Sequence, residues 1–302
     1  MRSTPTLSHL AITLSVAFAA FAAAPAHAQS DTLKTIAERG KMTLAYRESS
    51  VPFSYLDNNN KPVGFSVEIS NAIVEAVKKQ ANIPGLKVEF QPVTSQNRIP
   101  LLMNGTIDLE CGSTTNNSAR AKDVSFSHNI FYTGTRLLAK KSSKIKNYAD
   151  LKDKTVASTT GTTNAQVIRK YNTDSNLNMN IILGKDHVDT MLLVESDRAL
   201  AFAMDDILLF GLMANAKNPT EWEVVADALQ VEPYACMLRK DDPKFQAVVD
   251  GVIGGMMKSG EFEKLYNKWF NAAIPPKGIN LQLPIGAQLR ENMKAPNNKP
   301  AL

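Results

Sequence analysis

Strand-like and helix-like segments alternate along the first third of the chain, and this alternation restricts the possible folds more than any other feature. Apolar strands are expected over residues 42–46 and 107–111, and apolar and polar side chains alternate over 87–91 as in a third strand. Apolar residues recur at helical spacing through residues 65–77, and a second helix is expected over 97–105. This order predicts an α/β fold with a mainly parallel sheet that carries helices on its faces.

Three arginines follow the strands of this expected sheet. Arg47 comes directly after the first strand, while Arg98 and Arg120 each follow a run of hydroxyl and amide side chains that includes Ser95 or Ser113. A guanidinium group presents its N–H donors in a plane and can bind a carboxylate through two parallel hydrogen bonds. Ligands of such sheets bind beyond the carboxyl ends of the strands. The arginines are therefore candidates for one dianionic ligand, although the hydroxyl and amide residues would equally serve as helix caps.

A second unit is expected to begin after residues 134–139. Its strand over 155–157 leads into Ser158-Thr159-Thr160-Gly161-Thr162-Thr163, a strand-to-helix loop with glycine at the turn and hydroxyls at the helix start. Such a loop can hold one carboxylate or can simply cap the helix. It lacks the Gly-Lys-Ser/Thr ending of a P-loop, which argues against nucleotide binding.

Two further strands of this unit lead to titratable residues. The strand over 179–183 precedes His187. A lone histidine is more often structural than functional, so its place after a strand is the only reason to consider it a site candidate. The strand over 199–204 ends in Asp205 and Asp206. One aspartate could hold an ammonium group while the other caps the helix that opens at Ile207. The sequence leaves open which aspartate does which.

The chain has two cysteines, Cys111 and Cys236. In an exported protein such a pair is expected to form a disulfide, because a metal site would need further Cys or His ligands at close spacing. Two buried thiols are the alternative. If the cysteines are bridged, the chain has returned to the first unit at residue 236, so the second unit is an insertion joined by segments near residues 134–139 and 228–236. Two lobes on two linkers form a hinge around a cleft.

Residues 1–28 are typical of a secretory signal peptide, with Arg2, an apolar stretch over 10–24, and Ala26-His27-Ala28 as the cleavage site. No later segment has the roughly 18 apolar residues of a membrane-spanning helix. We therefore expect cleavage after Ala28 and a soluble, exported mature protein. Because Arg2 is the only charged side chain removed, the net charge falls from +5 to +4. Without a basic cluster, this charge does not indicate a nucleic-acid-binding protein.

Four segments carry a resemblance to a known family: residues 46–54, 94–102, 110–117 and 236–242. The chain resembles the amino-acid-binding proteins of ABC importers, solute-binding protein family 3, and is most similar to the glutamate/aspartate-binding members over about residues 32–285. The resemblance implies the two-lobe, type II periplasmic-binding-protein fold. The lobes would be residues 29–134 with 234–302, and the inserted residues 135–233.

The same resemblance implies a ligand, partners and roles for the candidate residues. The ligand would be L-glutamate or L-aspartate and the partner a membrane permease, with a monomeric periplasmic protein that needs no cofactor, metal or nucleic acid. Arg120, Ser113, Thr115, Thr162 and Thr163 would bind the ligand's α-carboxylate, and Asp205 its ammonium group. Arg47, Arg98, Ser95 and His187 would bind its side-chain carboxylate.

An enzyme on the same fold is the alternative hypothesis, because periplasmic dehydratases that act on small carboxylated substrates resemble these binding proteins. Such an enzyme would need a general acid or base in the cleft, for which Glu48, Glu110 and His187 are the candidates. The sequence has no nucleophile elbow, HExxH zinc motif or dinucleotide fingerprint. We therefore expect a binding protein.

Overall fold

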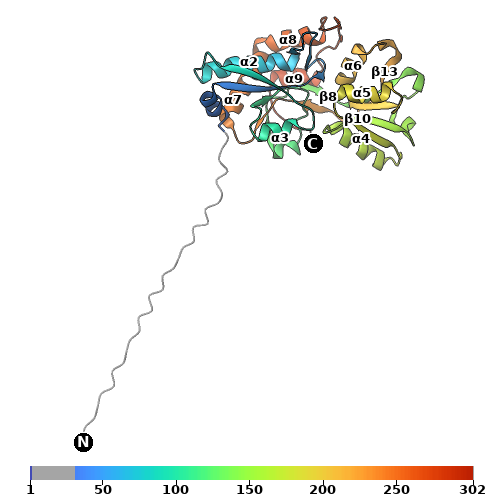
Figure 1. Cartoon of the computed structure of the whole chain (residues 1–302), viewed down its shortest axis with the longest axis horizontal. Coiled ribbons are helices and arrows are strands. Elements are labelled where there is room, and N and C mark those ends of the chain that lie inside the picture. Colours follow the sequence, from blue (N-terminus) through green and yellow to red (C-terminus); the bar gives the residue numbers. More distant parts are fainter. Residues whose placement is uncertain (2–30, 302) are drawn as a thin grey trace.

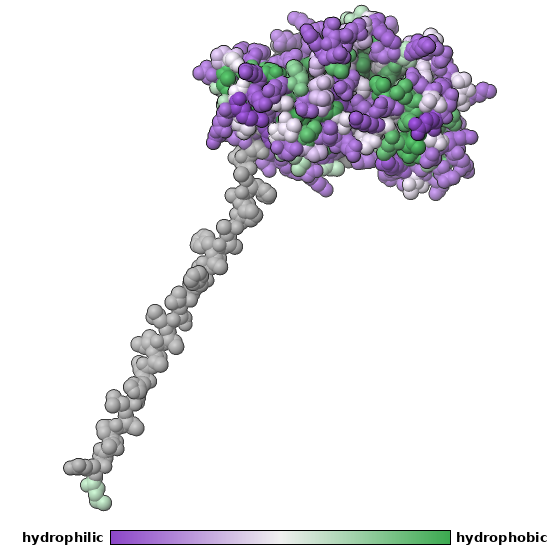
Figure 2. Space-filling view, in the orientation of Figure 1, coloured by the Kyte–Doolittle hydropathy of each residue, from purple (hydrophilic) through white to green (hydrophobic). Residues whose placement is uncertain are grey.

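The computed structural model describes Met1 and residues 31–301, and residues 31–301 form two α/β lobes (Figure 1). Apart from Met1, the signal peptide expected over residues 1–28 lies outside the described residues. In the described part of the chain, no helix is long and apolar enough to cross a lipid bilayer. The face drawn in Figure 2 is largely hydrophilic, with apolar side chains scattered among polar ones.

The first lobe is built on a five-stranded sheet with the order β5-β1-β6-β15-β7. Strands β5, β1 and β6 are parallel, and β15 runs antiparallel to both of its neighbours, so four of the five strands share one direction. The expected mainly parallel sheet is thus confirmed. The elements of this lobe are α1 (Thr32–Arg39), β1 (Lys41–Tyr46), β2 (Ser49–Ser50), β3 (Ser54–Leu56), β4 (Pro62–Val63), α2 (Phe65–Gln80), β5 (Lys87–Pro92), α3 (Arg98–Met103), β6 (Leu109–Glu110), η1 (Arg120–Lys122), β7 (Val124–Phe126), β15 (Met237–Arg239), α7 (Pro243–Ser259), α8 (Glu261–Phe270) and α9 (Ala287–Lys294).

Helices cover both faces of this sheet because its central strands are apolar on both sides. Along β1, Met42 and Leu44 join the core cluster that includes residues of α2, α7 and α8. Ala45, which points to the opposite face, joins Leu102 of α3 in a separate cluster. A strand buried on both faces has this pattern in α/β folds. The carboxyl end of β1 therefore lies between helix layers, where Arg47 follows.

The second lobe repeats this plan with a five-stranded sheet in the order β11-β10-β12-β9-β13. Here β9 is the one strand that runs against the other four. Its elements are β9 (Thr135–Lys140), η2 (Lys141–Ser143), η3 (Tyr148–Leu151), β10 (Thr155–Thr159), α4 (Thr163–Asp174), β11 (Asn180–Gly184), α5 (His187–Glu195), β12 (Ala201–Asp205), α6 (Asp206–Asn215), η4 (Pro219–Glu221) and β13 (Trp222–Val225). The loops after β10, β11 and β12 carry the candidate residues of this lobe.

The chain passes from one sheet to the other twice, through β8 (Phe131–Thr133) and β14 (Glu232–Tyr234). These strands pair antiparallel as a two-stranded ribbon. Residues 134–139 were expected to form the first crossing, but residues 135–140 are β9 of the second sheet. The apolar run there is buried as a sheet strand, and the crossing precedes it.

The ribbon is anchored in the first lobe by aromatic packing. The rings of Phe131 and Tyr234 contact that of Phe53 edge-on, with centroid separations of 5.0 and 5.2 Å. Edge-to-face pairs of this kind add to the stability gained from burial alone. The first-lobe end of the ribbon is therefore part of a packed core.

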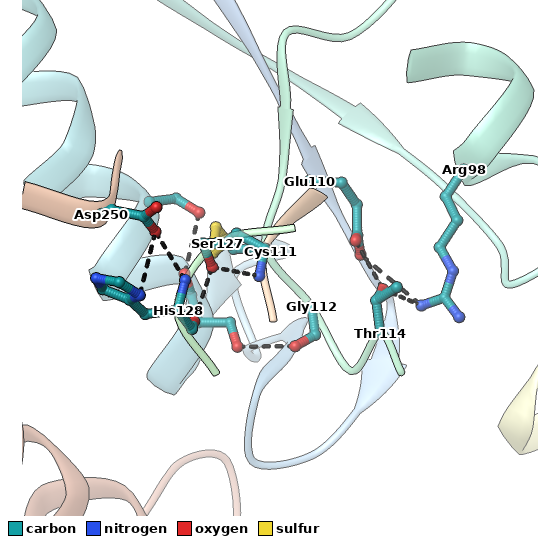
Figure 3. The surroundings of a disulfide bond; sticks show 11 residues. Arg98, Glu110, Cys111, Gly112, Thr114, Ser127, His128 and Asp250 are labelled. Atoms are coloured by element: carbon teal, nitrogen blue, oxygen red, sulfur yellow. Dashed lines mark hydrogen bonds and ion pairs between the residues drawn. A yellow bond between two sulfur atoms is a disulfide. The ribbon is translucent and has the colours of Figure 1, made fainter. Parts of the chain in front are cut away.

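The disulfide between Cys111 and Cys236 is present, as predicted (Figure 3). It joins the end of β6 to the start of β15, two strands that are neighbours in the first sheet. The sequence-based expectation was too long for β6, which covers only Leu109–Glu110 rather than residues 107–111. The segment after residue 275 contains a helix, α9, that no sequence pattern predicted.

Candidate functional site

A small cavity of about 10 Å³, lined mainly by polar residues, lies where the candidate residues of both lobes meet. Of the ten candidates, nine line it, and only Arg47 does not. Asn164, Met204 and Leu208 also line it, although none was predicted. The predicted residues in the lining are Ser95, Arg98, Ser113, Thr115, Arg120, Thr162, Thr163, His187 and Asp205.

Arg98 is fully enclosed at the start of α3, with 2% of its surface exposed. Its Nη1 donates to the carbonyl oxygen of Ser113 (3.2 Å) and to the Thr114 hydroxyl, which in turn donates to Oε2 of Glu110 (2.6 Å). Figure 3 shows Arg98 and Glu110 on either side of Thr114. Burial lowers the pKa of Arg98 to about 9, although the Glu110 carboxylate acts in the opposite direction. Arg98 thus remains a cation at neutral pH.

Arg120 connects the two lobes. Its Nη1 donates to the Thr115 carbonyl (3.0 Å) in the first lobe, and its Nη2 donates to the Gly161 carbonyl (3.2 Å) in the second. Burial lowers the pKa of Arg120, while the carboxylates of Glu232 and Glu110 favour its charged form. Two of its five N–H donors are thereby directed to backbone oxygens, and the guanidinium borders the cavity.

Arg47 is buried behind the cavity lining with none of its surface exposed. Its Nη2 donates to Oδ1 of Asp186 (2.6 Å) and approaches Nε2 of His187 at 3.3 Å. Its Nε and Nη1, together with Nε of Arg98, have no hydrogen-bond partner among the described residues. Buried donors are normally paired, and an anion within reach of these nitrogens would pair them.

His187 is a neutral imidazole in this arrangement. An arginine can only donate, so Nε2 of His187 accepts from Arg47, and Nδ1 carries the proton that is shared with Oγ1 of Thr159 (3.1 Å). Burial lowers the pKa of His187 to about 3, and the charges of Arg47 and Arg98 act in the same direction. The residue is the first of α5, so it follows the strand as expected but belongs to the helix.

The geometry distinguishes Asp205 from Asp206. Asp205 lines the cavity and accepts hydrogen bonds from Asn164 Nδ2 (2.8 Å) and from the hydroxyl of Tyr234. Asp206 instead accepts from the backbone N–H of Ile207 and from the Thr133 hydroxyl, both at 2.7 Å. Burial raises the pKa of Asp205 to about 7, and the neighbouring charge of Glu232 adds to this rise.

Glu232 of the ribbon meets both lobes at one carboxylate oxygen. Its Oε2 accepts from the hydroxyls of Thr115 (2.9 Å) in the first lobe and Thr163 (2.7 Å) in the second. Thr162, by contrast, uses its hydroxyl to cap α4, accepting from the N–H of Ala165 at 3.1 Å. Helix capping is therefore present at Thr162, while the hydroxyl of Thr163 bonds to a carboxylate of the protein itself.

Three carboxylates near the arginines, those of Glu110, Asp186 and Glu232, were not among the predicted site residues. Asp186 stands directly before the candidate His187, and Glu110 was considered only as a possible acid or base. Nothing in the sequence around Glu232 distinguishes it from a surface glutamate. Asn164 could have been found, because it directly follows Thr163 in the loop that was singled out.

These features define a two-lobe α/β protein of the type II periplasmic-binding-protein fold, with a polar cavity enclosed between the lobes. The chain belongs to the bacterial extracellular solute-binding proteins, family 3, whose model matches residues 42–272. This confirms the resemblance seen in the sequence.

The chain is 51% identical to a glutamate/aspartate import solute-binding protein of Escherichia coli (strain K12), over 98% of this chain and 97% of the relative. It is 48% identical to an L-glutamate/L-aspartate-binding protein of Pseudomonas aeruginosa, over 100% of this chain and 99% of the relative. Among solved structures, a mutant of the arginine-binding protein ArgBP from T. maritima matches with a TM-score of 0.71 and 27% identity, covering 80% of this chain and all of that one. The two relatives are transport or binding proteins by name, which favours a binding protein over an enzyme.

Proposed function

We propose that this protein captures L-glutamate or L-aspartate in the cavity between its lobes and delivers it to the membrane permease of an ABC importer. The observation that carries the proposal is the set of unpaired, buried guanidinium donors on Arg47 and Arg98 among the described residues, close to a cavity that Arg120 and Asp205 also border. The relatives that match nearly the whole chain are named for these two amino acids.

Each group of the ligand has a complementary set of residues. In this proposal the α-carboxylate accepts hydrogen bonds from Arg120 and from Ser113, Thr115, Thr162 and Thr163, through their hydroxyl or backbone donors. The ammonium group binds Asp205. The side-chain carboxylate accepts from Arg98 and from the free donors of Arg47, with Ser95 and His187 beside it. Charge-assisted bonds of this kind are the strongest hydrogen bonds available to a protein.

Binding is coupled to closure in the proposed mechanism. The first lobe (residues 29–134 and 234–302) and the inserted lobe (135–233) rotate about the β8–β14 ribbon. Because the ligand contacts both lobes only in the closed form, it raises the closed population by its difference in affinity for the two forms. The permease then recognises the closed surface.

We further propose that the protein acts in the periplasm after cleavage behind Ala28. Amino-terminal sequencing of protein recovered from the periplasmic fraction tests this directly, since the mature chain would begin Gln29-Ser30-Asp31. A chain that retains residues 1–28 in that fraction would contradict the assignment.

Discrimination against L-glutamine tests the ligand assignment. An amide in place of the side-chain carboxylate would leave the free buried donors of Arg47 and Arg98 without the ligand's anion, so L-glutamine should bind at least about two orders of magnitude more weakly than L-glutamate. The measurement is calorimetric titration of protein that has been unfolded and refolded to remove any bound ligand, with L-glutamate, L-aspartate, L-glutamine and L-alanine.

Micromolar or tighter binding, about −8 kcal/mol or better, confined to the two acidic amino acids would support the proposal. An affinity for L-glutamine within threefold of that for L-glutamate would refute the arginine assignment. Absence of binding to all four amino acids would contradict the proposal and favour the alternative hypothesis of an enzyme.

A further inference from the structure

Asp186 of the second lobe is bonded to two residues of the first lobe. Its Oδ1 accepts from Nη2 of Arg47 (2.6 Å) and its Oδ2 accepts from the hydroxyl of Ser49 (2.9 Å). The partners are separated from it by 139 and 137 residues along the chain. Asp186 is not among the residues that line the cavity. Like Arg47, it lies outside that lining, and its contacts join the two lobes.

An ordinary helix cap does not explain this side chain. Asp186 stands at the N-cap of α5, where an aspartate usually accepts a hydrogen bond from a backbone N–H of the first turn. Here the side chain makes no N-cap hydrogen bond; the backbone N–H of His187 lies near the carboxylate, but its two oxygens bond to Arg47 and Ser49 across the lobe interface. The helix forgoes a favourable cap, and the carboxylate is used between the lobes instead.

The N–H donors of Arg47 fall into two groups, one bonded to the protein and one without a partner among the described residues. One nitrogen, Nη2, is held by Asp186, with His187 nearby, while Nε and Nη1 have no partner among the described residues. Because the guanidinium is planar and rigid, fixing one nitrogen fixes the direction of the other two. A carboxylate on one side thus orients the donors that remain on the other.

We propose that Asp186 is a positioning residue that orients Arg47 toward the side-chain carboxylate of the ligand and that joins the lobes only when they are closed. This inference rests on the proposed function. Because the bridge exists only in the closed form, its loss should speed ligand release much more than it slows ligand entry.

The test compares variants by calorimetric affinity and by stopped-flow rates of association and dissociation. Asp186→Asn keeps the shape but removes the charge, and should weaken L-glutamate binding by at least about tenfold, nearly all of it through faster dissociation. Ser49→Ala removes one hydroxyl donor to the same carboxylate and should shift the dissociation rate in the same direction by a smaller factor. Asp189→Asn is the matched control, because Asp189 is an exposed acidic residue in the first turn of the same helix.

A double-mutant cycle separates positioning from a general structural role. If Asp186 acts mainly through Arg47, Asp186→Asn in an Arg47→Met background should cause only the small further loss of affinity expected from Ser49→Ala. Full additivity of the two changes, or wild-type dissociation from Asp186→Asn, would overturn the inference while leaving the proposed function intact. Failure of the wild-type protein to bind any acidic amino acid would instead overturn the proposed function and, with it, this inference.

Discussion

Each of the three site arginines has a carboxylate of the protein as a nearby counter-charge. Asp186 pairs with Arg47 at 2.6 Å, Glu110 lies 3.9 Å from Arg98, and Glu232 favours the charged form of Arg120. Burying a charge without a partner is costly, so these carboxylates allow the arginines to remain charged. The positions of the arginines after strands could be read from the sequence. Two of their counter-charges could not, because Asp186 comes from the other lobe and Glu232 from the ribbon.

The raised pKa of Asp205 predicts a pH-dependent affinity. Without ligand, this carboxyl group titrates near pH 7 rather than at its usual 3.8. An ammonium group favours the ionised form, so binding below about pH 7 should release up to about one proton and should weaken as the pH falls. Calorimetry at about pH 6 in buffers of different ionisation enthalpy measures this release. Proton release should disappear above about pH 8, and also in Asp205→Asn. An equal release at about pH 6 and about pH 8.5 would contradict the assignment to Asp205.

The raised pKa of Asp205 makes the stability of the unliganded protein fall with rising pH, whereas ligand affinity should rise. Because the folded state holds the proton more tightly than the unfolded state, the contribution of Asp205 is fully present below pH 3.8 and is lost as the pH rises through about 7. Ionisation of Asp205 therefore lowers the stability of the empty protein as the pH rises through about 7, and in the proposed complex the ligand's ammonium group would offset this loss.

At the scale of elements, the strand-to-helix loop at the start of α4 approaches the backbone of the other lobe closely, and a glycine lies at the point of closest approach. Gly161 has a φ of +77°, and a Cβ there would lie 2.6 Å from Cα and 2.7 Å from the backbone N of Gln96 in the other lobe. The backbone cannot yield as a flexible side chain can. The sequence indicated a turn at this glycine, but it could not show that the glycine faces the other lobe.

Gly161→Ala should therefore impair closure more than folding. The positive φ costs about 1 kcal/mol of stability, whereas the clash with Gln96 arises only when the lobes close and should weaken ligand binding at least about tenfold. Thermal unfolding and calorimetric titration measure the two effects separately. Gly105→Ala is the matched control, since Gly105 also has a positive φ of +79°, but a Cβ there would meet no heavy atom of the described chain within 4 Å. Equal losses of affinity in both variants would argue against the interlobe clash.

At the scale of the whole molecule, the insertion of one lobe into the other was predictable because the two cysteines indicated where the chain returns. The order of the strands was less accessible, since the reversed strands β9 and β15 look like any other apolar strand in sequence. The path after residue 275 was inaccessible. Its last described residues attach through backbone and asparagine hydrogen bonds, such as that from the Ala301 N–H to the Asn116 carbonyl (2.9 Å). Attachment of this kind produces no regular pattern of apolar residues in the sequence, so it could not be predicted.

Removing the disulfide should destabilise the protein without removing its site. The bridge spans 125 residues, and the loss of loop closure in the unfolded chain predicts a decrease of about 4–5 kcal/mol in the free energy of unfolding for the Cys111→Ala/Cys236→Ala variant. Chemical denaturation with and without a reducing agent measures it. The reduced wild-type protein serves as the control and should match the variant. An unchanged denaturation midpoint would show that the bridge does not contribute to stability.

The nested topology also sets the order in which the parts of the chain can be completed. All five strands of the second sheet lie within residues 135–225, so that lobe can assemble as soon as this stretch of chain is free to fold. The first sheet must wait, because β15 at residues 237–239 belongs between β6 and β7. Contacts between residues distant in sequence form slowly. The lobe whose sequence begins first is therefore the one that is finished last.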